Sequence, residues 1–396
     1  MRFHSVVSDR ENSAAAVEAV IEEIGEAGEG DSGSPLKVDV AFAFMTAHHR
    51  DDADAVIERL WLELDPQTIV GCSAEGVIGG DLEIERQPGL AVLAAEMPLV
   101  RIHPFHVGGE TDWRHVLTDA DELAERVGYG PETRAVIGFG DPFTTPTDPF
   151  LKALDDACPA APLVGGMASS ARQPGQNVLL RNDQVLTDGF VGVSFSGPVE
   201  VETVVSQGCR PIGRPMVVTK SHDNIVEALG GRPALEVLRD TVMELGEDDR
   251  HHLANGLFLG RAISEYRERF GRGDFLVRNV IGVDDESKSL GVADYVRTGQ
   301  TVQFHVRDAA TAGEDLGMLL ESQKAAERAA GGLLFSCNGR GTRLFDVHCH
   351  DIGLARKAMP TTPVAGFFAA GELGPVGGKN FIHGHTASFA LFRPGA

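Results

Sequence analysis

One structural pattern recurs three times along this 396-residue chain: a helix, a short apolar strand, a polar loop, a second helix, and a second apolar segment that ends in glycine and other small residues. The first strands are expected at 38–44, 135–140 and 333–336, and the second segments at 69–76, 162–169 and 363–371. The helices between them are expected at 51–64, 148–157 and 351–359. Strands that alternate with helices in this way predict an α/β fold with layered, largely buried sheets.

One part of the C-terminal half has a different pattern. Strands are expected at 257–263, 275–283 and 301–306, and charged turns connect them. Successive strands joined by turns, without helices between them, predict an antiparallel meander. The expected fold is therefore a set of repeated helix-strand-helix-strand units with an antiparallel meander in the C-terminal half.

Charge and apolar patterning exclude several classes of partner. The chain has 35 Lys and Arg against 58 Asp and Glu, a formal net charge of −23, and a field of that sign repels nucleic acid and anionic membranes. No run of about 20 apolar residues is present, so no membrane span is expected. The five cysteines are scattered and no signal peptide is visible at residues 1–10, which indicates a reduced, cytoplasmic protein.

The ends of the second apolar segments are rich in glycine and alanine. In open α/β sheets, ligands bind beyond the carboxyl ends of strands, and small residues there leave N–H groups exposed and allow close approach of a ligand. The alternative is tight packing of helices on the sheet with no ligand. Because all three copies share this feature next to polar loops, the sequence predicts a pocket for a small molecule.

Seven stretches carry a resemblance to a known family. Four lie at 275–284, 304–308, 335–341 and 366–375, the last leading to 380–384, and three looser ones lie at 70–73, 163–166 and 207–213. Together they resemble the FIST family, a bacterial sensory module with an N-terminal and a C-terminal part. The resemblance implies two domains, at 1–215 and 216–396.

The resemblance also implies a function. FIST proteins are similar to sensor inputs of signal transduction, with small ligands that include amino acids, and some members resemble haem-bound nitric-oxide sensors. Related chains are often fused to histidine kinases or chemoreceptors. We see no kinase ATP-binding region or receptor coiled coil here. A separate signalling partner, such as a histidine kinase, is therefore expected.

The residues expected to bind the ligand lie at the motif positions. They are Arg278, Asn279, Asn338, Arg340, Glu372, Asn380 and His383. The planar guanidinium group of Arg278 or Arg340 could donate two parallel hydrogen bonds to a ligand carboxylate, and Glu372 could accept hydrogen bonds from a ligand ammonium group. The alternative is an internal Arg–Glu pair that fixes the loops. For Asn380 and His383, hydrogen bonding that holds the loop 371–378 is the preferred interpretation.

The histidines and cysteines of the chain suggest alternative chemistries. His383 and His385 alternate on an expected strand and could contact haem, and the stretch 346–351 is dense in metal-ligand types, but it is interpreted as a polar loop with Asp351 as helix N-cap. No cofactor, metal or catalytic residue is therefore expected. Cys72 or Cys337 as the nucleophile of a hydrolase or transferase remains an alternative, although a buried thiol is the commoner role.

Overall fold

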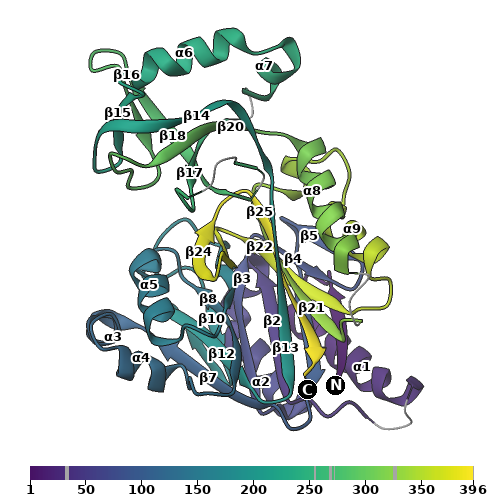
Figure 1. Cartoon of the computed structure of the whole chain (residues 1–396). Coiled ribbons are helices and arrows are strands. Elements are labelled where there is room, and N and C mark those ends of the chain that lie inside the picture. Colours follow the sequence, from purple (N-terminus) through teal and green to yellow (C-terminus); the bar gives the residue numbers. More distant parts are fainter. Residues whose placement is uncertain (32–34, 254–255, 267–269, 272, 324–327, 396) are drawn as a thin grey trace. The chain divides into compact units, whose positions relative to one another are not determined.

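The computed structural model describes residues 1–31, 35–253, 256–266, 270–271, 273–323 and 328–395 (Figure 1). The chain forms two compact units. Unit 1 comprises residues 1–205, 316–382 and 386–396, and unit 2 comprises residues 206–315 and 383–385. No helix in the described part of the chain is both long and apolar enough to cross a membrane.

Unit 1 contains three six-stranded sheets, each built around a pair of parallel strands with a helix between them in sequence. The pairs are β2 (Val40–Thr46) with β3 (Thr68–Ala74), β8 (Thr133–Gly140) with β9 (Leu163–Met167), and β21 (Gly331–Cys337) with β22 (Val364–Ala369). The helices within the pairs are α2 (Ala53–Leu64), α5 (Thr147–Ala157) and α9 (His350–Ala358). The repeated α/β units expected from the sequence are therefore confirmed.

Antiparallel strands complete each sheet on one side of its parallel pair. They are β6 (Leu90–Glu96) and β1 (Arg2–Ser8) in the first sheet, β12 (Phe190–Ser196) and β7 (Arg101–Val107) in the second, and β25 (Thr386–Pro394) and β13 (Val199–Gln207) in the third. The helices that precede the pairs are α1 (Ser13–Asp31), α3 (Gly109–Val116) with α4 (Ala120–Arg126), and α8 (Ala309–Ser322).

A hairpin completes each sheet on the other side, and it comes from a different repeat. The three hairpins are β10 (Leu179–Arg181) with β11 (Gln184–Leu186) in the first sheet, β23 (Glu372–Val376) with β24 (Lys379–His383) in the second, and β4 (Gly76–Gly79) with β5 (Leu82–Glu85) in the third. The hairpin that follows β3 thus pairs with β22, and the hairpin that follows β22 pairs with β9. This exchange binds the three repeats into one unit.

Unit 2 is an antiparallel sheet that closes on itself, because β14 pairs with both β20 and β15. Its strands are β14 (Cys209–His222), β15 (Ile225–Leu229), β16 (Arg232–Pro233), β17 (Leu257–Ala262), β18 (Phe275–Asp284), β19 (Ser289–Val292) and β20 (Thr301–Arg307). Two helices, α6 (Ala234–Glu244) and α7 (Glu247–Leu253), lie between β16 and β17 in sequence. The antiparallel C-terminal region predicted from the sequence is confirmed.

Three phenylalanines, one from each repeat, meet in the core of unit 1. Phe44 of β2, Phe139 of β8 and Phe335 of β21 are all fully buried. Their ring centroids are 5.2 Å apart for Phe44 and Phe139, 5.8 Å for Phe139 and Phe335, and 6.5 Å for Phe44 and Phe335, each in an edge-on arrangement. Such aromatic pairs contribute about 0.5–1.5 kcal/mol beyond the burial of their surface. The equivalent first strands therefore converge on a shared centre.

A glycine in each second strand lets the parallel pair approach. Gly71, Gly165 and Gly366 lie opposite Ala43, Gly138 and Leu334 of the first strands. A Cβ on these glycines would lie 1.7, 1.8 and 1.7 Å from the carbonyl oxygen of the residue opposite. Because that oxygen belongs to a buried strand backbone, a side chain could be accommodated only by displacing one strand of the pair.

We expect Gly366→Ala to destabilise the protein by about 3 kcal/mol or more, because the methyl group would displace β21 from β22. The matched control is Gly353→Ala in the exposed part of α9, where a Cβ meets nothing within 4 Å. This control should gain about 0.5–1 kcal/mol from the better helix former. Urea unfolding of both variants checks the prediction, and equal stabilities of the two would contradict it.

Candidate functional site

The second strands of the three repeats meet at Ser169, just beyond the end of β9. The Ser169 hydroxyl accepts a hydrogen bond of 2.9 Å from the Glu75 N–H, just beyond β3, and donates one to the carbonyl oxygen of Phe368 in β22. One serine therefore connects the carboxyl ends of strands from all three repeats. This is the place where the sequence predicts a pocket.

A small cavity lies at this junction, entirely within unit 1. Its volume is about 10 Å³, which is room for roughly one water molecule. The lining residues are Glu75, Gly76, Glu85, Arg86, Asn338, Arg343 and Phe368. Four of the seven are charged. The cavity is therefore polar and small, and any larger occupant requires side chains to move.

An ion pair between Arg343 and Glu75 forms one wall of the cavity. The Nη1 atom of Arg343 donates to Glu75 Oε2 at 2.8 Å and to the Asn338 carbonyl oxygen at 2.6 Å, and its Nη2 atom donates to Glu75 Oε1. The hydrogen bonds to Glu75 raise the pKa of Arg343. The two side chains are 39% and 26% exposed. Exposed pairs contribute only about 0–1 kcal/mol, so a competing ligand could open this one.

Glu85, at the end of β5, anchors the loop that carries Arg343. Its carboxylate accepts hydrogen bonds of 2.9 Å from both the N–H and the hydroxyl of Thr342. Arg86 donates to the same hydroxyl at 3.0 Å. Gly341 has a φ of +55°, and a Cβ there would lie 2.6 Å from the Glu85 carboxyl group. The loop thus depends on a glycine at this position and on the hairpin β4–β5 from another repeat.

Arg340 lies in the same loop but is fully buried. Its Nε and Nη2 atoms donate to Asp351 at 2.7 and 2.8 Å, and Ser336 and His350 also hydrogen-bond to that carboxylate, at 2.7 and 2.9 Å. Burial alone would raise the pKa of Asp351, but Arg340 and these partners hold it well below its usual range. Asp351 is therefore not the helix N-cap expected from the sequence, because α9 begins at His350 with Cys349 as N-cap.

Glu372, in the first position of β23, is also fully buried. Thr386 donates to its Oε2 atom from the backbone N–H at 3.1 Å and from the hydroxyl at 2.7 Å. Burial raises the pKa of Glu372 to about 8, although the bonds from Thr386 and the charge of Arg340 oppose the rise. Within the described chain, Glu372 Oε1 and Arg340 Nη1 have no hydrogen-bond partner. Arg340 thus pairs with Asp351 and not with Glu372.

The other predicted ligand residues lie in different surroundings. Asn338 lines the cavity. Asn380 connects strands: its Oδ1 atom accepts from the Leu163 N–H at 2.8 Å, and its Nδ2 atom donates to Asp155 at 2.7 Å.

Three further predicted residues belong to unit 2, so they are not among the groups of the unit 1 cavity. The Nε atom of Arg278 is 3.8 Å from Asp294 Oδ2, and the Asn279 Oδ1 atom is 2.9 Å from His385 Nε2. His383 is the last residue of β24 and is buried. The strand expected to run through His383 and His385 is interrupted, because His385 has a φ of +62° and β25 begins at Thr386.

The sequence reasoning missed several residues of this site, namely Glu75, Glu85, Arg343 and Asp351. Glu75 lies within the second apolar segment at 69–76, and Arg343 lies just beyond Gly341, the last residue of the motif at 335–341. Among the cysteines, Cys72 is fully buried and burial raises its pKa well above the ordinary value, which is unfavourable for a nucleophile.

Replacing Arg340 by Met should destabilise the protein by about 3–5 kcal/mol, because Asp351 would be left as a buried charge without a cation. The double variant Arg340→Met/Asp351→Asn should recover part of this loss. Urea unfolding of the single and double variants measures the coupling. A double variant less stable than Arg340→Met would show that the ion pair is not what requires Arg340.

Glu372→Gln should change how stability depends on pH. The pKa of Glu372 is about 8 in the folded protein against 4.5 ordinarily, so between these values the unfolded chain releases a proton that the folded protein keeps, and wild-type stability falls as pH rises. The amide has no such proton. Relative to wild type, the variant should therefore gain about 2–4 kcal/mol between pH 5 and pH 8. Unfolding curves measured at both pH values test this, and parallel pH profiles would contradict it.

Two family models and related mycobacterial proteins match most of this chain. The model of the FIST N domain matches residues 39–232, and that of the FIST C domain matches residues 234–375. An uncharacterized protein of Mycobacterium tuberculosis strain H37Rv is 39% identical over 350 residues, 87% of this chain and 88% of that protein. An uncharacterized protein of Mycobacterium bovis is 37% identical over 381 residues, 95% of this chain and 96% of that protein.

A solved structure, cyanuric acid hydrolase from A. caulinodans, aligns over 100% of this chain and 99% of that chain with a TM-score of 0.38 and 10% identity, which is too distant to inform function. FIST domains are associated with small-ligand sensing in signal transduction. Both domain models match, in order, over nearly the whole chain. The chain belongs to the FIST family.

Proposed function

We propose that this protein is a cytoplasmic sensor of a small zwitterion, an amino acid or a related small carboxylate, which binds between Arg343 and Glu75. The observation that carries the proposal is the junction of the three repeats, where two arginines, two carboxylates and an amide surround one cavity. The proposal keeps the ligand class expected from the sequence. It moves the principal cation from Arg278 or Arg340 to Arg343, because Arg340 is committed to Asp351 and Arg278 belongs to unit 2.

Arg343 and Glu75 are a cation and an anion. Each can therefore pair with the opposite charge of a zwitterion. A ligand carboxylate can accept from both Nη atoms of Arg343, as Glu75 does in the structure. The released Glu75 carboxylate, together with Glu85, can accept hydrogen bonds from the ligand ammonium group. Each buried charge of the ligand then meets an opposite one, which is the condition for binding a charged molecule away from water.

Binding must change the shape of the site, because a cavity of about 10 Å³ cannot hold an amino acid. Arg343 lies in the short helix at Gly341–Arg343, which is held at Thr342 by Glu85. Displacing Arg343 therefore alters the contact between this loop and the hairpin β4–β5. We propose that this rearrangement is the signal and that a separate partner, such as a histidine kinase, detects it.

The haem alternative has less support from the geometry. The Nε2 atom of His385, which would bind iron, lies 2.9 Å from the Asn279 side chain, and its ring packs against Phe258 with centroids 4.4 Å apart. An axial role for His385 would require both contacts to be broken.

The decisive experiment is isothermal titration calorimetry against three sets of compounds: the standard amino acids, matched carboxylates without the amine, and matched amines without the carboxylate. One or more zwitterions should bind, and should raise the melting temperature, because a ligand selective for the native state stabilises it. Arg343→Gln should weaken binding at least tenfold. The control Arg114→Gln also removes an arginine from an exposed Arg–Glu pair and should leave the affinity within twofold.

Glu75→Gln separates the two ends of the ligand. It should reduce the preference for the zwitterion over the matched carboxylate, because it removes the acceptor of the ammonium group. Unchanged affinity in Arg343→Gln would refute the site, and no binding by any compound of the three sets would refute the ligand class.

A further inference from the structure

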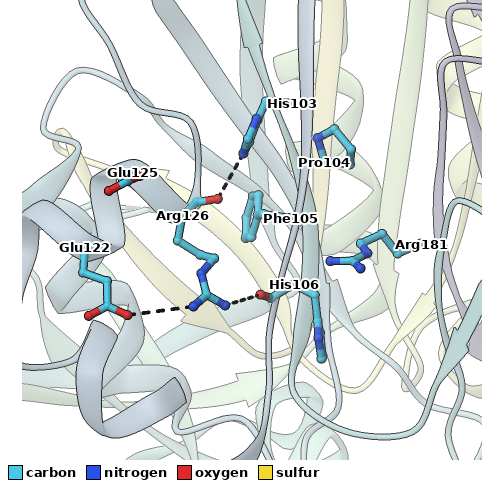
Figure 2. A pocket seen from close by; sticks show the side chains of 8 residues that line it. All are labelled: His103, Pro104, Phe105, His106, Glu122, Glu125, Arg126 and Arg181. Carbon is cyan, nitrogen blue, oxygen red and sulfur yellow. Dashed lines mark hydrogen bonds and ion pairs between the residues drawn. The ribbon is translucent and has the colours of Figure 1, made fainter. Parts of the chain in front are cut away.

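A second hollow lies on unit 1, formed by the edge strand β7, helix α4 and Arg181 of β10 (Figure 2). Its volume is about 560 Å³, within the range of roughly 300–1,000 Å³ typical of small-ligand sites. The lining residues are His103, Pro104, Phe105, His106, Glu122, Glu125, Arg126 and Arg181. None of them belongs to the zwitterion site described above.

Two glycines hold the histidines of this hollow in place. A Cβ on Gly128, which has a φ of +66°, would lie 2.5 Å from His103 Cγ, and a Cβ on Gly108 would lie 2.5 Å from His106 Cε1. Both imidazole rings therefore pack against backbone that no other residue could provide without moving them. This fit indicates a preformed wall.

Hydrogen bonds to backbone carbonyls fix which nitrogen of each imidazole ring carries the proton. The Nε2 atom of His103 lies 3.1 Å from the Arg126 carbonyl oxygen, and that of His106 lies 3.0 Å from the Asp188 carbonyl oxygen. Because a carbonyl oxygen only accepts hydrogen bonds, each Nε2 carries the proton. The Nδ1 atom of each neutral ring can then accept a hydrogen bond from a ligand.

Arg126 is already neutralised by acidic side chains. It lies 3.0 Å from Asp112 and 3.8 Å from Glu122, and it donates to the His106 carbonyl oxygen at 3.2 Å (Figure 2). With two carboxylates beside it, Arg126 serves to hold α4 against β7. It does not provide a free positive charge for a ligand.

Arg181 differs from Arg126 in this respect. Its guanidinium group points into the hollow beside His106, and its Nη2 atom donates to the Gln184 side chain at 2.7 Å (Figure 2). No carboxylate of the described residues lies within 4.0 Å of it. Arg181 therefore keeps a guanidinium group that can pair with an external anion, whereas Glu122, which also lines the hollow, is occupied by Arg126.

We propose that this hollow is a second ligand site, which binds a small organic anion, either a carboxylate or a phosphate monoester. The anionic group accepts two hydrogen bonds from the Arg181 fork, and the imidazole of His106 lies beside it. The organic part of the ligand contacts Pro104 and the imidazole faces. The site is independent of the zwitterion site, because the two share no residue.

The test uses the full chain and four probes: malonate, inorganic phosphate, benzoate and phenyl phosphate. Calorimetry should detect binding of at least one, and the histidine ring resonances of His103 and His106, assigned from His→Gln variants, should shift on titration. Arg181→Gln should weaken that binding at least tenfold. The control Arg172→Gln removes another exposed arginine, outside the hollow, with the same change in net charge, and should stay within twofold of wild type.

Comparison of the probes identifies the source of the anion. Preference for malonate or benzoate indicates a carboxylate ligand, and preference for inorganic or phenyl phosphate indicates a phosphate ester. The proposal fails if Arg181→Gln and Arg172→Gln weaken binding equally, since binding would then follow net charge alone. It also fails if no probe shifts the His103 and His106 resonances. Arg343→Gln should leave the probe-induced shifts of the His103 and His106 resonances unchanged, so the two sites can fail separately.

Discussion

Within each repeat, the second strand of the parallel pair approaches the first so closely that a carbonyl oxygen occupies the space of a side chain. Gly71, Gly165 and Gly366 provide that space. In each first strand the next residue along is a core phenylalanine, so the same register that brings the strands together also directs the three rings to one centre. The carboxyl ends of the strands follow directly from this register. The site at Ser169 therefore depends on three backbone contacts that no side chain can replace.

The charged groups of the site form two layers with different energetics. Arg340 and Asp351 are buried, and separating them would leave an uncompensated charge at a cost of about 3–5 kcal/mol. Arg343 and Glu75 are partly exposed, and their separation costs far less. One loop carries both arginines, so its base is fixed while its outer end can exchange partners. The small cavity beside this outer pair can therefore enlarge without separating the buried pair.

The sequence predicted the repeats, the glycine-rich strand ends and the antiparallel region, because these follow from local periodicity and from the steric demands of glycine. It placed Asn338, Arg340 and Glu372 near the site but not their partners. Asp351 was predicted to cap a helix, since a capping aspartate and a buried one look alike without the distance to Arg340. Glu75 and Glu85 were missed because their hairpin pairs with β22, almost three hundred residues later. Such an exchange leaves no local trace in the sequence.

The scaffold repeats three times, but the chemistry at its ends does not. The residue four positions after the close-approach glycine of each second strand is Glu75 in the first repeat, Ser169 in the second and Ala370 in the third. A symmetric centre would present the same group three times and could not distinguish the two ends of a zwitterion. These positions therefore carry one acidic, one hydroxyl and one apolar side chain, and the arginine loop of the third repeat adds a further cation. The residues that break the repeat therefore determine the chemistry of the strand ends, and substitutions at these positions should change that chemistry without changing the fold.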